Sequence, residues 1–583
     1  MKKTKFTSLL AIAAIFLLFS CGPDAPGWKH NDNTVRVRQA AEIVTLNPYN
    51  ASTGYERQAF DLIFQCPMNF DFKALALAPQ LIKAAPTKQD ITDGEFAGGQ
   101  SFAFEILPEA TWDDGKPVTG NDFVFNLKVL FNPKMGLKKF LGYLEAVREI
   151  KVDAANPKLF TVFTNSKYFL NMEAISNINI VPEHIYDSGG LMKKFTLNEL
   201  TDPAKAAAVA DDPALQQFAD AYKSPKYSRE VISGSGPYKL AEWVDGQRVV
   251  LAKKQNWWGE KLAGQYPLLQ SYPDTIVFLP ISDQVAAIAA IKDESVDVAF
   301  ELDAKQYTEL RTVDFVQKIY NFFTPPTDIY YFTAMQNRIP KLADKRVRRA
   351  LASCIDVDVV IKDMYNGLAE RVVGPFSADK NYFDKSLKPI AMNLDEARKL
   401  LADAGWKDSN GNGTVDKTID GALVEMKLQY LFVAGSTFAE NLGLLLKSNA
   451  QKVGIEIELA SVESKVLGEK RRNGEYELAA SGAKYQPIPE DPKQYWHTDG
   501  AVPGGSNYAR FGNATTDALI DGIQNAPDEA TRIQYYKDFQ KILYDEQPFI
   551  FLFSPQERII VHQRFEPVVS RMGVSLQHLK LKK

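Results

Sequence analysis

The sequence predicts an α/β protein built from two lobes, and three observations lead to this fold class. Segments of alternating hydrophobicity interleave with capped amphipathic helices along most of the chain. Residues 424–459 have the pattern of a strand, a helix and a second strand, which indicates a parallel pair with a right-handed crossover. The chain has 583 residues, 45% of them hydrophobic and 24% charged, which is enough material for more than one core.

The first twenty residues have the composition of a secretory signal. A basic start precedes an apolar run at residues 6–19, which closes on Leu18-Phe19-Ser20-Cys21. The run is shorter than the roughly 20 residues that span a bilayer comfortably. The Leu-x-Ser-Cys ending resembles a bacterial lipobox, so we expect a lipid on Cys21 and a working place outside the cytoplasm. An ordinary cleaved signal, with Cys21 an incidental thiol, is the alternative.

Residues 21–33 are then a lipid-anchored tether, because Gly and Pro in the stretch 22–27 block both helix and strand. This organisation predicts a location in the cell envelope, on its periplasmic or cell-surface side. The formal net charge is only −4, from 68 basic and 72 acidic residues. No broad basic surface is therefore offered to nucleic acid.

The cysteines and histidines give no sign of a metal or cofactor. Apart from Cys21 the chain has Cys66 and Cys354, and Cys354 lies on an apolar helical stripe with Val347 and Leu351. We expect both to be buried free thiols. The five histidines show no metal-ligand spacing, and no C-x-x-C pair occurs.

The amino-terminal part predicts a strand at 34–38, followed by an aromatic and polar loop at a turn, a common arrangement at a ligand edge. Candidate binding residues there are Tyr49, Asn50 and Ser52. Further on, Thr119 and Asp122 form a capping box that opens a helix. Residues 200–223 predict surface helices of an insertion that lies over a lobe.

A stiff Thr324-Pro325-Pro326 stretch leads to a strand that ends near Asn337, another candidate binding residue. We interpret this stretch as a crossover between lobes. Helices with clear caps follow, beginning at Asp344, Asp356 and Asn393. The second α/β lobe is expected at 323–547.

Catalytic motifs are missing from the sequence. It has no G-x-S-x-G elbow, no H-E-x-x-H, no Walker loop and no G-x-G-x-x-G after a strand. The stretch 408–413 resembles the start of a calcium loop, but Ile419 stands where a bidentate acid belongs, which favours a simple turn. The basic cluster at 341–349 flanks an apolar stripe and indicates a solvated helix face.

Several residues near the carboxyl-terminal third are candidates for a ligand pocket. Asp491 precedes a proline and either caps a helix or meets a ligand charge. Tyr485, Trp496 and Tyr508 lie in loops rich in Gly and Pro. Core anchoring remains open for Trp496, whereas Tyr485 and Tyr508 have the character of pocket walls.

Several blocks, in order, resemble the bacterial family five extracellular solute-binding proteins, the dipeptide- and oligopeptide-binding components of ABC importers. The resemblance covers residues 34–555. The blocks are Thr45-Leu46-Asn47-Pro48, the run 111–119 (TWDDGKPVT) with Asp122-Phe123-Val124-Phe125, Val181-Pro182-Glu183-His184-Ile185, Gly234-Ser235-Gly236-Pro237-Tyr238, Asp344 with the run 346–350 and Ile355-Asp356, and the run 400–406 before Asp408.

The resemblance implies a periplasmic-binding-protein-like fold of class II with a discontinuous first lobe. That lobe would comprise 34–64, 225–322 and 548–583, with an extra subdomain at 65–224. Two crossovers, near residues 323 and 547, would form a hinge about which the lobes close on an unmodified ligand. It also implies a peptide or other small solute as ligand, an ABC permease as partner and a monomer without a cofactor.

One departure from the family pattern concerns ligand choice. Where the family often has a Gly-Trp pair followed by an acid, this chain has Gly482-Ala483-Lys484-Tyr485, and the next acids are Glu490 and Asp491. The expected ligand-binding set is completed by Ser481, the four positions 482–485, Asp491 and Asn507. Longer peptides or another solute therefore remain open, as do a surface hydrolase of peptides or glycans and a sensor that serves no permease.

Overall fold

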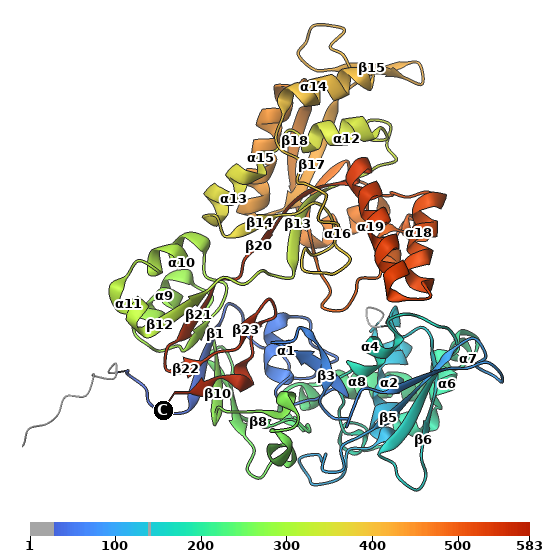
Figure 1. Ribbon diagram of the computed structural model, residues 1–583, viewed down its shortest axis with the longest axis vertical. Helices are drawn as coiled ribbons and strands as arrows, with labels where there is room; N and C mark the ends of the chain where they lie inside the picture. Colours follow the sequence, from blue (N-terminus) through green and yellow to red (C-terminus); the bar gives the residue numbers. More distant parts are fainter. Residues whose placement is uncertain (1–27, 138–140, 583) are drawn as a thin grey trace, which may run out of the picture.

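The computed structural model describes residues 28–137 and 141–582 and shows two α/β lobes, which lie one above the other in Figure 1. Two extended connections, residues 324–328 and 556–558, pass between the lobes. The expected signal peptide and Cys21 lie outside the described residues. Within the described ranges, no helix has both the length and the apolar character that crossing a membrane requires.

Lobe 1 is organised around a seven-stranded sheet of order β12-β21-β11-β1-β10-β9-β8. β1 pairs in parallel with β10 and with β11, and the remaining neighbours are antiparallel. The alternation along β1 buries Val35 and Val37. The strands are β1 (Thr34–Gln39), β8 (Tyr238–Val244), β9 (Arg248–Lys253), β10 (Thr275–Pro280), β11 (Val298–Ala299), β12 (Tyr320–Phe323) and β21 (Ile559–His562).

Three short helices cover one end of this sheet: α9 (Gln284–Lys292), α10 (Ala304–Leu310) and α11 (Asp314–Ile319). Their apolar residues form a core with Tyr320 of β12 and Ile560 of β21. A fourth helix, α1 (Gly54–Phe60), begins with a capping box in which Thr53 and Glu56 exchange hydrogen bonds. The lobe ends in two small hairpins, β22 (Phe565–Glu566) with β25 (Lys580–Leu581), and β23 (Val569–Ser570) with β24 (Gly573–Val574).

The extra subdomain contains an antiparallel sheet of order β4-β5-β7-β6 and a separate β2–β3 hairpin. Phe104 and Phe160 stack at 4.8 Å, and Phe123 of α2 lies 4.9 Å from Phe160. This core is continuous with that of lobe 1, so the two are expected to move as one body. The elements are β2 (Met68–Asp71), β3 (Ala76–Pro79), β4 (Thr87–Asp90), β5 (Gln100–Glu105), α2 (Gly120–Phe131), β6 (Val147–Val152), β7 (Leu159–Thr164), α4 (Asn171–Ser176), α5 (Glu183–Tyr186), α6 (Leu197–Thr201), α7 (Pro203–Val209) and α8 (Pro213–Lys223).

Two of the sequence blocks meet where the subdomain joins lobe 1. Asp113 of the tryptophan block accepts a 3.2 Å hydrogen bond from the backbone N–H of Gly234 and forms a 2.5 Å ion pair with Lys254. Gly234 packs so closely on the carbonyl of Ile63 that a Cβ atom at this position would overlap it. These two blocks therefore have a structural role: they connect the extra subdomain to lobe 1, at a contact called the joint of the subdomain below.

Lobe 2 contains a six-stranded sheet of order β14-β20-β13-β19-β17-β18. The predicted strand–helix–strand unit is confirmed, because β17 and β18 are parallel neighbours joined by α15 (Thr437–Gln451). The strands are β13 (Ile329–Met335), β14 (Ala369–Arg371), β17 (Lys427–Val433), β18 (Glu456–Val462), β19 (Leu478–Lys484) and β20 (Phe549–Pro555).

The position of β20 corrects the expected lobe boundary. We expected residues 548–583 in lobe 1, but β20 pairs with β13 and β14 inside the sheet of lobe 2. All of its residues are buried, since both faces of the sheet are covered there. The second crossover consequently follows Pro555.

The remaining helices of lobe 2 begin at the expected caps. The side chains of Asp344, Asp356 and Asn393 accept hydrogen bonds from backbone N–H groups of the first turn. These helices are α12 (Lys345–Ala352), α13 (Val357–Tyr365) and α14 (Leu394–Asp403), and the others are α16 (Ser464–Asn473), α17 (Lys493–Trp496), α18 (Ala514–Asn525) and α19 (Glu529–Glu546).

The loop that resembles a calcium site is a turn held by its own aspartate. Asp408 accepts hydrogen bonds from the backbone N–H groups of Gly411, Asn412 and Gly413, at 2.8, 3.1 and 2.9 Å. Both carboxylate oxygens are thus used within the loop, which leads into the hairpin β15 (Asp416–Ile419) and β16 (Ala422–Glu425). Elsewhere, Cys66 and Cys354 are buried free thiols, as predicted.

Candidate functional site: the interlobe crevice

The sheets of the two lobes point the carboxyl ends of their parallel strands at each other. In lobe 1, β1, β10 and β11 run in the same direction as β12, which leads into the first crossover. In lobe 2, β17, β18 and β19 run in the same direction as β20, which leads into the second crossover. Ligands of α/β proteins bind outside the carboxyl ends of parallel strands. The region between the lobes where these strand ends face each other, called the interlobe crevice below, is therefore the candidate site.

A buried arginine organises the lobe 1 side of the crevice. Arg38, at the end of β1, donates to the carbonyl oxygens of Ile281 at 2.8 Å and Phe300 at 2.5 Å, which follow β10 and β11. Burial lowers the pKa of Arg38 although the charge of Glu301 opposes this effect. Next to this point Tyr55 of α1 donates a hydrogen bond to Glu301. Three strand ends and α1 are in this way held together as one rim.

Arg57 on α1 is an exposed cation of this rim. Its side chain is 55% exposed and pairs with Asp61 at 3.2 Å. The charge of Asp61 raises the pKa of Arg57, and Asp328 at the first crossover adds to the effect. The charge of Asp328, at the start of lobe 2, therefore favours the charged form of Arg57.

The lobe 2 wall is the carboxyl-terminal half of β19, where four of the predicted binding residues follow one another. Ser481, Gly482, Ala483 and Lys484 pair in register with residues 332 to 329 of β13. Lys484 is 65% exposed and lies 3.8 Å from Asp328. These residues lie beside the start of β13, which follows the first crossover, and so are on the side of lobe 2 that faces the crevice.

Tyr485 lies at the end of this wall, but it is a buried residue. Its ring stacks on Tyr330 at 4.7 Å, and its N–H donates to the carbonyl of Asp328 at 2.6 Å. Burial raises its pKa. Its side chain is on the same face of β19 as Ala483 but packs into the core of lobe 2, so it does not form the pocket wall that its loop suggested.

Arg471 of α16 brings two other predicted residues together. It donates a hydrogen bond to the hydroxyl of Ser481, and its guanidinium lies 5.2 Å from the ring centroid of Tyr508. The exposed ring of Tyr495 lies 6.5 Å from that of Tyr508. An arginine with two tyrosines therefore extends the wall beyond β19.

An acid pair follows, and its two members have different surroundings. Glu490 is 9% exposed, and burial raises its pKa to about 7 although Lys380 opposes the shift. Tyr382 donates a hydrogen bond to Oε2 of Glu490, while Oε1 makes no hydrogen bond. Asp491 instead accepts three hydrogen bonds, from the N–H of Lys493 at 2.9 Å, from Gln524 at 2.8 Å and from Tyr168 at 2.9 Å.

The bond from Tyr168 crosses between the lobes, because Tyr168 belongs to the extra subdomain. Two further contacts accompany it. The ring of Phe169 lies 4.8 Å from the guanidinium of Arg532 on α19 and packs against the core of lobe 2. Tyr143 has its pKa raised to about 12 by burial, with contributions from Tyr495 and the two acids. The subdomain and lobe 2 thus meet around Asp491.

The three amino-terminal candidates have structural contacts, and one of them, Tyr49, is buried contrary to expectation. Tyr49 is 6% exposed, and its hydroxyl donates to the carbonyl of Asn179 at 2.6 Å, so it is a core residue. Asn50 bonds to the carbonyl of Tyr222 and the hydroxyl of Ser228, both at 3.3 Å, and holds the subdomain. Ser52 donates its N–H to Glu56 and belongs to the cap of α1.

Two predicted asparagines are structural as well. Asn337 lies beyond the end of β13 that is distant from the crossover, and its amide donates to the carbonyls of Met335 and Pro548. Asn507 is fully buried and donates to the carbonyls of His497 and Phe511, closing a turn. Both side chains are buried, and their amide donors are used by backbone carbonyls.

The residues that the sequence reasoning missed are Arg57, Tyr168 and Arg471. Arg57 stands on an ordinary helical pattern, and Tyr168 follows a strand without any motif. The adjacent aromatic residues Tyr168 and Phe169, both half-buried, are the one sequence feature at this wall.

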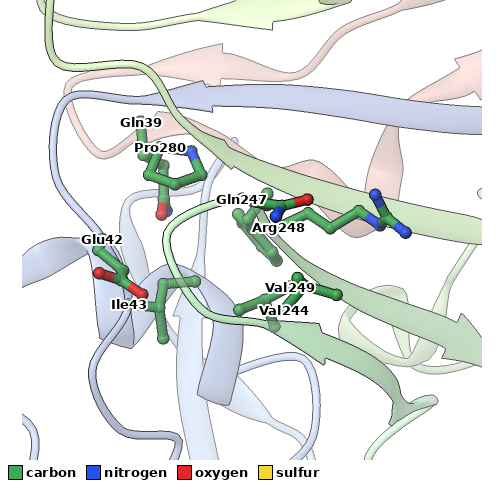
Figure 2. A pocket seen from close by; sticks show the side chains of 9 residues that line it. Gln39, Glu42, Ile43, Val244, Gln247, Arg248, Val249 and Pro280 are labelled. Carbon is green, nitrogen blue, oxygen red and sulfur yellow. The ribbon is translucent and has the colours of Figure 1, made fainter.

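A hollow of about 200 Å³, open to solvent, lies in lobe 1 at the carboxyl ends of β1 and β10, beside the β8–β9 turn (Figure 2). Glu42, Gln247 and Arg248 surround it, and Glu42 accepts a 2.8 Å hydrogen bond from the N–H of Gly246. It is shallow and open, so we assign no ligand to it. Among the described residues, no group of three or more His, Cys, Asp or Glu side chains could hold a metal ion.

Two hinged α/β lobes with a crevice between their strand ends define a ligand-binding protein of the periplasmic-binding type. The chain belongs to the bacterial extracellular solute-binding proteins, family 5, whose model matches residues 85–505. It is 23% identical over 581 residues to the oligopeptide-binding protein AppA of Bacillus subtilis, covering 96% of this chain and 94% of AppA. It is 22% identical over 462 residues to the periplasmic oligopeptide-binding protein OppA of Salmonella typhimurium, covering 75% and 73% of the two chains.

Solved structures agree with this fold. That of AppA from Bacillus subtilis in complex with a nonapeptide has a TM-score of 0.68 at 20% identity and covers 94% of this chain and 99% of the other. That of NikA from Brucella suis in complex with Fe(III)-EDTA has a TM-score of 0.74 at 16% identity and covers 94% and 100%. The same fold therefore holds chemically different ligands.

Proposed function

We propose that this protein binds oligopeptides in the interlobe crevice, outside the cytoplasm, and delivers them to an ABC permease. The observation that carries the proposal is the exposed end of β19 facing the rim of α1 across the crossovers. An extended peptide could add its backbone to such a strand end, while aromatic and charged side chains on both walls receive its side chains. The named relatives that bind oligopeptides support this ligand class.

The charges at the crevice favour a ligand with groups of both signs. Arg57 and Lys484 supply cations, and Asp61 and Asp328 supply anions, each paired with a neighbour on its own side. A peptide with charged termini or side chains can exchange partners with these pairs when the lobes close. Closure removes water from such contacts, which strengthens them.

The test is to purify the protein under native conditions and identify what leaves the crevice by mass spectrometry, then to titrate synthetic peptide pools while following tryptophan fluorescence. We expect peptides, chemically unaltered, and a saturable signal. A different solute in the crevice would overturn the ligand class. Turnover of a labelled peptide or glycan library, lost in Glu490→Gln, would instead establish the hydrolase alternative.

The anchoring is part of the same proposal. We infer that Cys21 carries a lipid and that the protein acts as a monomer on the outer side of the membrane that holds its permease. Metabolic labelling with a radioactive fatty acid should mark the wild type and leave Cys21→Ser unlabelled. If label is absent from both, the tether proposal is wrong while the binding proposal stands. If the variant still reaches its permease unaided, the function is that of a diffusible binding protein.

A further inference from the structure

Arg571 stands at the turn of the last hairpin of lobe 1, between β23 and β24, and its side chain crosses to the other lobe. It forms an ion pair with Asp379 and donates to the hydroxyl of Ser377 at 2.9 Å and to the carbonyl of Thr327 at 3.3 Å. Its guanidinium also lies 6.0 Å from the ring centroid of Tyr485. One side chain thus contacts the hinge, a loop of lobe 2 and the end of the crevice wall.

These contacts hold the two lobes together at a specific point. The side chain of Arg571 is only 14% exposed, and its planar fork reaches several acceptors at once. Burial opposes ionisation of Asp379, but hydrogen bonds from Arg571 and Ser377 and the charge of Arg571 outweigh it and lower the pKa. Asp379 is 45% exposed, so the ion pair is open to screening by salt.

The loop that Arg571 holds continues to the acid pair of the crevice. Lys380 donates to the carbonyls of Pro487 and Ile488, at 2.8 and 3.2 Å, and Tyr382 contacts Glu490. Asp491, the next residue, receives the bond from the subdomain. The loops 377–382 and 485–491 are therefore packed together and held from lobe 1 at both ends.

We propose that Arg571 is a positioning residue for ligand binding: it sets the affinity by fixing lobe 2 against lobe 1, without touching the ligand. This inference rests on the proposed function, in which closure about the hinge creates the binding-competent state. The apparent affinity of such a protein is scaled by the population of its competent conformation. A residue that stabilises the closed arrangement therefore acts on all ligands by the same factor, whereas a residue that contacts ligand discriminates among them.

The first experiment needs no ligand. Small-angle X-ray scattering of ligand-free wild type, Arg571→Ala and Asp379→Ala is expected to show a larger radius of gyration in both variants and in wild type at 1 M NaCl. The matched control is Arg248→Ala, which removes an arginine paired with Glu242 at 2.8 Å inside lobe 1, and should leave the scattering unchanged. Identical profiles for all four proteins would overturn the proposal.

The second experiment measures affinity with synthetic pentapeptides and nonapeptides that bind the wild type. Arg571→Ala is expected to weaken every one of them by a common factor of about ten, the size of one charge-assisted contact. Arg571→Lys keeps the positive charge but lacks the planar guanidinium, so its loss of affinity should lie between those of wild type and Arg571→Ala. Losses that differ widely from peptide to peptide would show that Arg571 contacts the ligand and would refute the positioning role.

A double-mutant cycle separates the pair from a general loss of folding. If Arg571 and Asp379 act together, the double variant is expected to bind no more weakly than Arg571→Ala alone. Additive losses would contradict this. Should Arg571→Ala fail to fold, as judged by near-ultraviolet circular dichroism, Asp379→Asn from the other lobe decides the question. If no peptide binds the wild type, the proposed function fails, while the scattering data still decide whether Arg571 fixes the lobes.

Discussion

The hydroxyl of Tyr168 donates a 2.9 Å hydrogen bond to Oδ2 of Asp491, and this bond connects the extra subdomain to lobe 2. The two residues are 323 positions apart in the chain. Asp491 was expected either to cap a helix or to meet a ligand charge. The structure gives it the capping bond to Lys493 and, in addition, an interlobe contact.

We predict that Tyr168→Phe binds ligand severalfold more weakly and releases it faster, because the closed arrangement loses one charge-assisted hydrogen bond. Stopped-flow dissociation of a fluorescent peptide measures the effect. Tyr272→Phe is the control, since its exposed hydroxyl bonds only within lobe 1, to Gln270. Equal dissociation rates for the two variants would contradict the prediction.

The raised pKa of Glu490 should make the stability of the folded protein depend on pH. Its pKa is raised from 4.5 to about 7 in the folded protein, so the folded state binds more protons than the unfolded state between these values. Stability therefore falls as the pH rises from 4.5 to 7 and stays lowered above 7. Glu490→Gln mimics the neutral acid, and above pH 7 it is expected to be more stable than wild type by about 3 kcal/mol.

Urea unfolding of wild type and Glu490→Gln, followed by tryptophan fluorescence from pH 4.5 to 8, measures this difference. Glu309→Gln, at an exposed position of α10 in lobe 1, is the control. Curves for Glu490→Gln and wild type that run parallel over the whole range would show that Glu490 titrates normally.

Gly234 is expected to tolerate no side chain, because a Cβ atom would overlap the carbonyl of Ile63 and the backbone must move. We predict that Gly234→Ala lowers the free energy of unfolding by about 2 kcal/mol, as overpacking does. Gly264→Ala provides the control, since no atom lies within 4 Å of its added Cβ. Thermal unfolding compares them, and equal midpoints would refute the steric argument.

Asp113→Asn is predicted to destabilise the joint of the subdomain by about 3 kcal/mol, because it leaves the largely buried ammonium of Lys254 without its partner. Burial already lowers the pKa of Lys254, and removal of Asp113 should lower it further. Asp245→Asn, which breaks an exposed 2.8 Å pair with Arg229, should change little. Calorimetric unfolding of the two variants gives the comparison, and losses of similar size would rule out burial as the cause.

Local patterns in the sequence predicted the parallel β17–α15–β18 unit and the helix caps, because periodicity and capping are set by neighbouring residues. They misplaced the second crossover, since β20 is apolar from Phe549 to Phe553 and such a strand suits either lobe. Tyr49 illustrates the same limit at the site. Its loop has the composition of a loop that lines a ligand site. The hydroxyl of Tyr49, however, donates a hydrogen bond to the carbonyl of residue 179, which is distant in the sequence. The interlobe contacts of Tyr168 and Arg571 depend on such distant pairings and carry no local signal.

The shared apolar core of lobe 1 and the extra subdomain limits how this molecule can be re-engineered. A shortened version lacking residues 65–224 would expose a large apolar surface of lobe 1 to solvent and should aggregate. A reporter protein for a biosensor is better grafted at the tip of the β15–β16 hairpin. There Asp420 and Gly421, with φ of 51° and 82°, make a two-residue turn that belongs to neither wall of the crevice.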